Sequence, residues 1–142
     1  MSVLFSRSCE YALQALVEMA RHPEQKFWNV FKLAEQLNIP ATFLAKIYQS
    51  LAKKDILISR KGVKGGFAFA EPPEGIAVLG VIEAIDGLEL VHECVMGLPQ
   101  CGDDNPCPFH EHWKKIKEII HRELGNKSLS NFAEQTGRIN GQ

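Results

Sequence analysis

The chain has 142 residues, of which 45% are hydrophobic and 23% charged, a composition typical of a soluble globular protein with one ordinary core. No apolar run approaches the roughly 20 residues that cross a bilayer, and no basic region followed by a long apolar stretch opens the chain, so we expect neither a membrane span nor a signal peptide. In the cytoplasmic protein that we therefore expect, thiols stay reduced, and four cysteines favour metal binding or redox sensing over disulfides.

The net charge of −1 conceals a segregation of charge along the chain. Residues 41–70 carry six basic residues and one acidic residue, whereas residues 71–112 carry nine acidic residues and no lysine or arginine. A basic surface of this kind suits a polyanion such as DNA. The alternative is a solvated charged surface, which is disfavoured because the basic residues coincide with the motif described next.

Three amphipathic helices are predicted in the first part of the chain. Ser6 or Ser8 can cap the first, which ends near Arg21. Apolar residues at helical spacing predict the second over residues 30–37 and the third over residues 41–54. Because only a short turn separates the second and third helices, the pair forms a helix-turn-helix, whose second helix can enter the DNA major groove.

A β-hairpin is predicted directly after the third helix. Residues 56–58 and 67–70 favour two strands, and the connection between them is rich in glycine and basic residues. A basic hairpin in this place is the wing of a winged helix-turn-helix. Winged helices also serve as protein-interaction modules, but the basic charge on the groove-facing elements favours DNA.

The expected DNA contacts divide between these two elements. Thr42, Lys46 and Gln49 lie on the exposed face of the third helix and can reach base edges, with Lys53 on the same face. At the wing, we expect phosphate or minor-groove contacts from the basic residues Arg60, Lys61 and Lys64. Gly65 and Gly66 allow a sharp turn or a close approach of the backbone to DNA.

The second half of the chain predicts a short helix over residues 78–85, a cysteine-containing loop and a long helix that begins near Pro108. The long helix carries an apolar stripe, for which we predict a two-fold dimer interface; its main members are Trp113, Ile116, Ile120 and Leu124. The alternative is that the stripe packs only on the chain's own first helix. A further short helix over residues 128–135 and a frayed tail over residues 136–142 complete the chain.

Three cysteines, Cys94, Cys101 and Cys107, gather on the loop, and His110 follows three positions after the last. Structural zinc sites usually contain closer cysteine pairs, whereas iron–sulfur clusters tolerate varied loop spacings. A cluster, a zinc site and a thiol/disulfide switch therefore remain open on spacing alone. An enzyme is disfavoured, because the chain has no Cys-x-x-Cys pair, nucleophile–base constellation or nucleotide-binding loop.

The chain resembles the winged-helix iron–sulfur regulators that include IscR and NsrR over nearly its full length. The resemblance depends on residues 10–13, 33–35, 43–51 and 59–67 together with the three cysteines. It implies a mostly α fold with a small β-hairpin wing, in which residues 1–75 bind DNA, residues 76–107 contain the cluster loop, and residues 108–142 contain the dimerisation helix and tail. It further implies a cytoplasmic homodimer that binds a pseudo-palindromic operator, most often as a repressor, and needs no membrane or small-molecule substrate.

The same resemblance implies that Cys94, Cys101 and Cys107 hold an iron–sulfur cluster that senses iron–sulfur, nitric oxide or redox status. A fourth, variable residue completes the ligand set. His110 matches the histidine of the IscR-like members and favours [2Fe–2S], whereas Glu10 of the partner subunit matches the NsrR-like carboxylate, which favours [4Fe–4S]. We favour His110. Cys9 lies outside the motif and is expected to be a buried helix thiol.

Overall fold

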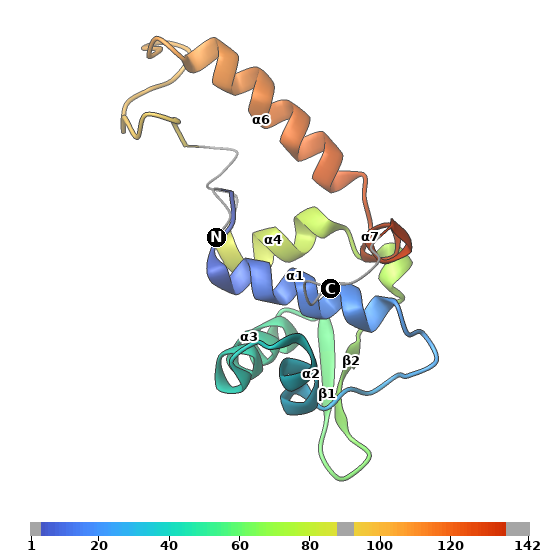
Figure 1. Cartoon of the computed structure of the whole chain (residues 1–142). Helices are drawn as coiled ribbons and strands as arrows, with labels where there is room; N and C mark the ends of the chain where they lie inside the picture. Colours follow the sequence, from blue (N-terminus) through green and yellow to red (C-terminus); the bar gives the residue numbers. More distant parts are fainter. Residues whose placement is uncertain (1–3, 88–92, 136–142) are drawn as a thin grey trace.

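The computed structural model describes residues 4–87 and 93–135, which form a helical body with a two-stranded hairpin at one end (Figure 1). The first helix, α1 (Arg7–Ala20), crosses the middle of this body. Ser6 caps it as predicted, since its side chain accepts a hydrogen bond from the Cys9 N–H. The buried residues of α1 are mainly small or aliphatic, among them Ala12, Ala15 and Leu16, and Glu18 is the charged exception.

The predicted helix-turn-helix is present as α2 (Val30–Leu37) and α3 (Ala41–Lys53). Asn29 caps α2 by accepting hydrogen bonds from two backbone N–H groups, and Asn38 ends it in the left-handed conformation, at φ 58°. The third helix buries Leu44, Ile47 and Leu51, the apolar residues whose spacing predicted it, and also the aromatic residue Tyr48. These burials fix the orientation of α3, so that its opposite face is turned to solvent.

The wing consists of β1 (Leu57–Arg60) and β2 (Gly66–Phe69), paired antiparallel, with each strand displaced by one or two residues from its predicted bounds. A third segment joins them, because Trp28 makes an isolated bridge to Phe67. The N–H of each of these two residues donates to the carbonyl of the other, at 2.8 Å in both directions. The loop between α1 and α2 is thereby attached to the base of the wing.

Both glycines at the end of the wing loop are required by contacts inside the protein. A Cβ on Gly66, whose φ is +130°, would lie 2.2 Å from the Trp28 carbonyl oxygen. A Cβ on Gly65 would lie 2.0 Å from the Arg60 carbonyl oxygen. Real Cβ atoms do not approach carbonyl oxygens so closely. The packing of the wing therefore explains both glycines, independently of any contribution that they make to DNA binding.

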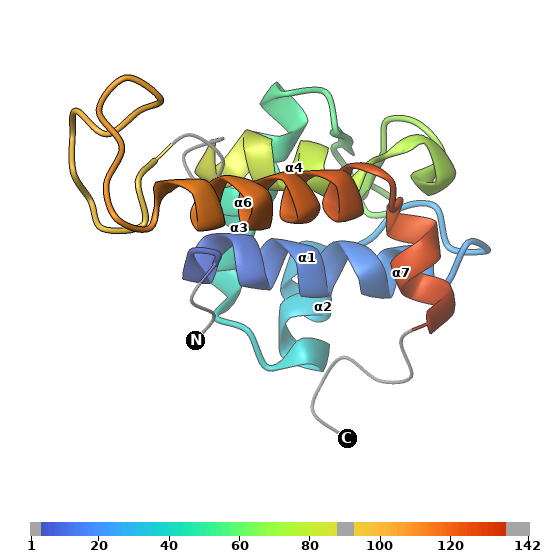
Figure 2. The same ribbon diagram turned by 90° about the horizontal axis from the view of Figure 1, so that it is seen from above.

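After the wing, a 3-10 turn (η1, Pro73–Gly75) leads to α4 (Val78–Asp86), which packs on α1, α3 and α6. The long helix α6 (His110–Gly125) begins two residues later than predicted, and α7 (Leu129–Gln135) follows it and packs on α1. Leu129 is fully buried in the core, whereas α6 contains no buried residue. Figure 1 shows α6 above α4 and α1, and Figure 2 shows the cysteine loop extending beyond the first turn of α6. The predicted tail over residues 136–142 lies outside the described residues.

Across residues 4–87 and 93–135, none of the helices combines the length and the apolarity that crossing a bilayer requires.

Candidate metal centre and nucleic-acid interface

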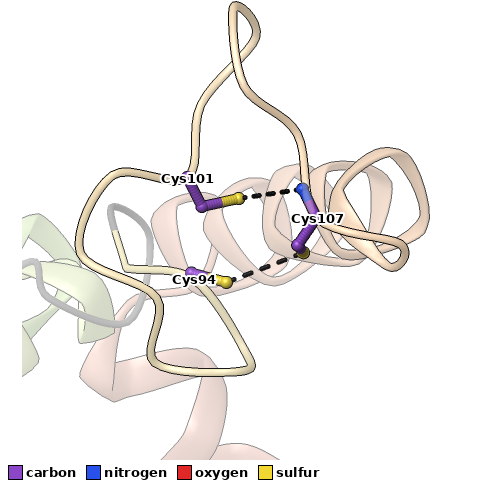
Figure 3. Close-up of side chains that lie close together, drawn as sticks. All are labelled: Cys94, Cys101 and Cys107. Atoms are coloured by element: carbon purple, nitrogen blue, oxygen red, sulfur yellow. Dashed lines mark hydrogen bonds between the residues drawn. The ribbon is translucent and has the colours of Figure 1, made fainter.

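The three loop cysteines converge on one point, although Cys94 and Cys107 are separated by 12 residues (Figure 3). Their sulfur atoms all lie within 4.8 Å of one another, and the Cys94 and Cys107 sulfurs are 3.7 Å apart. Backbone groups hold the arrangement, since the Cys107 N–H donates to the Cys101 sulfur and the Met96 N–H donates to the Cys94 sulfur, both at 3.4 Å. The loop therefore presents three soft donors inward.

His110, the first residue of α6, lies against one of these sulfurs, that of Cys101. Its Nδ1 lies 3.4 Å from the Cys101 sulfur, and its Nε2 lies 2.9 Å from a carboxylate oxygen of Asp103. The imidazole is mostly shielded, with its side chain 15% exposed. The side chain predicted as a fourth ligand thus contacts one of the three thiols, that of Cys101.

This donor set fits a metal or an iron–sulfur cluster. Two thiolates on one tetrahedral ion, with bonds of about 2.3 Å, lie about 3.8 Å apart, close to the separation of the Cys94 and Cys107 sulfurs. A cavity of about 590 Å³ adjoins the cysteines and His110, so a small inorganic cluster would have room beside them. Thiolate sulfur and imidazole nitrogen are donors for both iron–sulfur clusters and zinc.

The cysteines differ in acidity. A hydrogen bond from the Leu98 backbone, supported by one from Met96 and by the other two thiols, lowers the pKa of Cys94 to about 7. The pKa of Cys101 is raised: the Cys107 N–H lowers it, but desolvation and the neighbouring thiols outweigh that hydrogen bond. In the metal-free protein Cys94 is thus the more easily ionised of these two thiols.

The first helix holds the competing ligand, Glu10. One of its carboxylate oxygens lies 3.7 Å from the Arg7 Nε of the same chain. Its neighbour Cys9 is fully buried, and desolvation, assisted by the Asp86 carboxylate, raises the pKa of its thiol to about 12. Cys9 is the buried helix thiol that its position predicted.

The side chains predicted to reach DNA from α3 are all exposed: Thr42, Lys46, Gln49 and Lys53. On the wing, Arg60, Lys61 and Lys64 are exposed too. The guanidinium of Arg60 is already held in place, because its central carbon lies 4.3 Å from the centre of the Phe27 ring. In Figure 1, α3 and the hairpin lie below α1, so these exposed side chains belong to elements on the same side of α1.

The apolar stripe of α6 is only partly covered by its own chain. Leu124 packs against the core, and Trp113 is half-buried with its indole N–H donating to the Glu93 carbonyl at 2.9 Å. Ile116 and Ile119 remain 39% and 50% exposed. The chain's own body thus covers the C-terminal end of the stripe better than its middle, and the dimer interface remains a prediction.

Comparison with known proteins assigns the chain to a family. A family profile described as "Iron-dependent Transcriptional regulator" matches residues 5–135. The chain belongs to the Rrf2 family. A protein of Aquifex aeolicus, assigned to the HTH-type transcriptional regulators, is 32% identical over 120 residues, which are 83% of each chain. The HTH-type transcriptional regulator IscR of Yersinia pestis is 28% identical over 120 residues, which are 84% of this chain and 73% of the relative.

Among solved structures, CymR (YrzC), the global cysteine regulator of B. subtilis, has the same fold, with a TM-score of 0.80 and 18% identity over 96% of this chain and all of that chain. The winged-helix fold and the resemblance to IscR are thereby confirmed. As an Rrf2 protein, the chain is a DNA-binding transcriptional regulator and not an enzyme.

Three features of this Rrf2 chain escaped the sequence reasoning. Lys54, counted with the basic surface, instead donates to the Ala84 carbonyl of α4. The stacking of Arg60 on Phe27 and the contact between Asp103 and His110 were also missed. Each joins residues from different elements, so no short-range spacing signals it; the nearest available hint was the position of Asp103 between two cysteines.

Proposed function

We propose that this Rrf2 protein is a cytoplasmic homodimeric repressor whose operator affinity depends on an iron–sulfur cluster held by Cys94, Cys101, Cys107 and His110. The convergence of the three thiols, all within 4.8 Å of one another, carries the proposal. The contact of His110 Nδ1 with the Cys101 sulfur supports the histidine over Glu10 of the partner subunit as the fourth ligand. With that histidine, the favoured cluster is [2Fe–2S] over [4Fe–4S].

In this proposal α3 and the wing bind the operator. Thr42, Lys46 and Gln49 read base edges from the exposed face of α3, while Lys53 contributes positive charge. Arg60, Lys61 and Lys64, with the backbone at Gly65, contact phosphates or the minor groove. A dimer formed through Trp113, Ile116, Ile120 and Leu124 places two such units on a pseudo-palindromic site. The exposed middle of the stripe supports this contact.

A bound cluster supplies a centre that reacts with oxidants and nitric oxide. The remaining steps belong to the protein, and α4 is the element that would convey a change in the cysteine loop. Its last residue, Asp86, accepts hydrogen bonds from both the backbone N–H and the hydroxyl of Ser6, the cap of α1. Lys54, which follows α3, donates to Ala84 in the last turn of α4. A shift of that turn would therefore reach both α1 and the DNA-reading helix.

Two measurements test the proposal. Anaerobically purified protein is expected to be coloured and to contain iron and acid-labile sulfide. Serine substitutions of Cys94, Cys101 or Cys107 should abolish the colour, whereas Cys9→Ala, a control at a buried thiol outside the loop, should leave it intact. Colourless protein without sulfide would reject the cluster.

The second measurement compares operator binding by cluster-loaded and metal-free protein at one salt concentration, with an operator selected from random duplexes. Unequal affinities support the sensing function, and equal affinities reject it. His110→Ala and Glu10→Ala, examined by Mössbauer spectroscopy, decide between the two candidate ligands.

The 3.7 Å separation of the Cys94 and Cys107 sulfurs favours a second candidate, a thiol/disulfide switch. With hydrogen peroxide as oxidant, the two thiols would lose two protons and two electrons to form the disulfide, and the peroxide would be reduced to two waters. A zinc site uses the same donors without redox chemistry. Metal analysis separates these alternatives, since only the zinc site retains zinc on purification, and mass spectrometry of metal-free protein after peroxide treatment detects the Cys94–Cys107 cross-link that the switch requires.

A further inference from the structure

We propose that Asp103 is a positioning residue that holds the His110 imidazole in its Nε2–H form and so presents Nδ1 to the cysteine sulfurs. The inference rests on the proposed function, in which His110 is the fourth ligand, and it names the ligand atom and the group that selects it. It depends on three side chains at the start of α6 and in the loop before it: Asp103, His110 and Lys114.

The two ring nitrogens of His110 face different chemical groups, a cysteine sulfur and a carboxylate. Nδ1 lies 3.4 Å from the Cys101 sulfur, and Nε2 lies 2.9 Å from the Asp103 carboxylate. A neutral imidazole has one N–H, and an ionised carboxylate can only accept a hydrogen bond. The hydrogen therefore belongs on Nε2, which leaves the Nδ1 lone pair directed at the Cys101 sulfur. In the opposite tautomer an N–H would point at the metal position and could not coordinate.

The position of Asp103 is itself fixed. Gly102 and Asn105 pair their backbones in both directions, at 3.3 and 3.1 Å, which makes a tight turn with Asp103 as its second residue. Lys114, one helical turn after His110, places its Nζ 3.5 Å from the same carboxylate oxygen. Aspartate is ionised at neutral pH, so both oxygens of the Asp103 carboxylate act only as acceptors.

Asp103 contributes through orientation more than through charge. Its side chain is 71% exposed, so water screens its ion pairs. A carboxylate on the outer nitrogen of a ligand histidine is nonetheless a recurrent device that fixes the tautomer and the ring orientation, and its removal typically lowers metal affinity about 10- to 100-fold. The neighbouring Asp104 is also exposed and offers a matched control, because its substitution removes the same charge from the same turn.

The first test uses reduced, metal-free protein at alkaline pH, where histidine is neutral. Long-range ¹H–¹⁵N correlation spectra report the tautomer of each imidazole. His110 is expected as the Nε2–H form in the wild type and in Asp104→Ala, and as a mixture of tautomers in Asp103→Ala. An Nδ1–H form in the wild type, or identical His110 spectra in the wild type and Asp103→Ala, would overturn the inference.

The second test measures loss of the cluster to an iron chelator from anaerobically loaded protein. Asp103→Ala is expected to lose it about 10- to 100-fold more readily than Asp104→Ala, and His110→Ala is expected to lose it at least as readily as Asp103→Ala. Equal retention by the two aspartate variants, with His110→Ala still impaired, overturns the positioning role alone. Wild-type retention by His110→Ala instead overturns His110 as a ligand in the proposed function, and the positioning inference with it.

Discussion

Substitution of Gly66 by alanine tests whether the wing base depends on the close approach of the Trp28 backbone. A Cβ at this position would lie 2.2 Å from the Trp28 carbonyl oxygen, and the φ of +130° is itself unfavourable for alanine. The alanine must therefore push Trp28 away and break its two hydrogen bonds with Phe67, each 2.8 Å long. Gly62, with a φ of +106° and nothing within 4 Å of its added Cβ, provides the matched control.

The structure gives the expected size of the effect. Both substitutions incur backbone strain of about 1–3 kcal/mol, but only Gly66→Ala also loses two backbone hydrogen bonds, each worth about 1 kcal/mol. Gly66→Ala should therefore be less stable than Gly62→Ala by about 2 kcal/mol. At about 3 °C per kcal/mol for a chain of this size, its Tm should be about 6 °C lower.

Thermal unfolding of the wild type and both variants at one protein concentration measures this difference. Operator affinity should also fall further in Gly66→Ala, because the wing loses its attachment to the loop between α1 and α2. Equal Tm values for the two variants would refute the claim that contact with Trp28 makes Gly66 necessary.

Three further outcomes are expected. Ile120→Glu should turn a dimer into a monomer in sedimentation, because it places a charge in the apolar stripe. The control Lys115→Glu, on the outer face of α6, should stay dimeric. A dimeric Ile120→Glu variant would exclude the stripe as the interface. Lys64→Ala should weaken DNA binding for all sequences alike and reduce the slope of log affinity against log salt by about 1, and an unchanged slope would remove Lys64 from the phosphate contacts. In the metal-free protein, alkylation of Cys94 should rise through about pH 7, since its lowered pKa leaves it a thiolate above that pH and a thiol below it. Cys9, with a pKa near 12, should stay unreactive while the protein is folded; equal pH profiles would contradict the assigned environments.

The helices were predictable from apolar stripes at helical spacing, which most of them bury and which α6 leaves partly exposed. Val30, Leu33 and Leu37 illustrate this in α2: all three are buried, and the predicted bounds agree with the structure. The wing was predictable from two apolar runs around a glycine-containing connection. Its third segment was not, because a single bridge at Trp28 has no periodicity and depends on how the loop after α1 folds back.

Some features of the candidate metal site were likewise predictable from the sequence, and others were not. Packing alone gives no reason for three thiols on an irregular loop, so they indicate a metal or cluster that all three bind. Their convergence was therefore predictable. The choice between His110 and Glu10 was not, because it depends on loop geometry and, for Glu10, on a second copy of the chain. The contact of Asp103 with His110 also lies beyond sequence reasoning, because it requires the turn that brings the loop back to α6.

The two tryptophans lie in different parts of the protein, so their intrinsic fluorescence can report on each part. Trp28 is nearly buried at the wing base, with its indole N–H donating to the Gln25 carbonyl at 3.0 Å. Trp113 lines the cavity beside the cysteines. Excitation energy would pass from Trp113 to any chromophore bound there that absorbs visible light. Trp113 fluorescence would therefore decrease when that chromophore binds. Phenylalanine at either position would isolate the other signal, and stopped-flow fluorescence could then time events at the cysteine loop separately from movement of the wing.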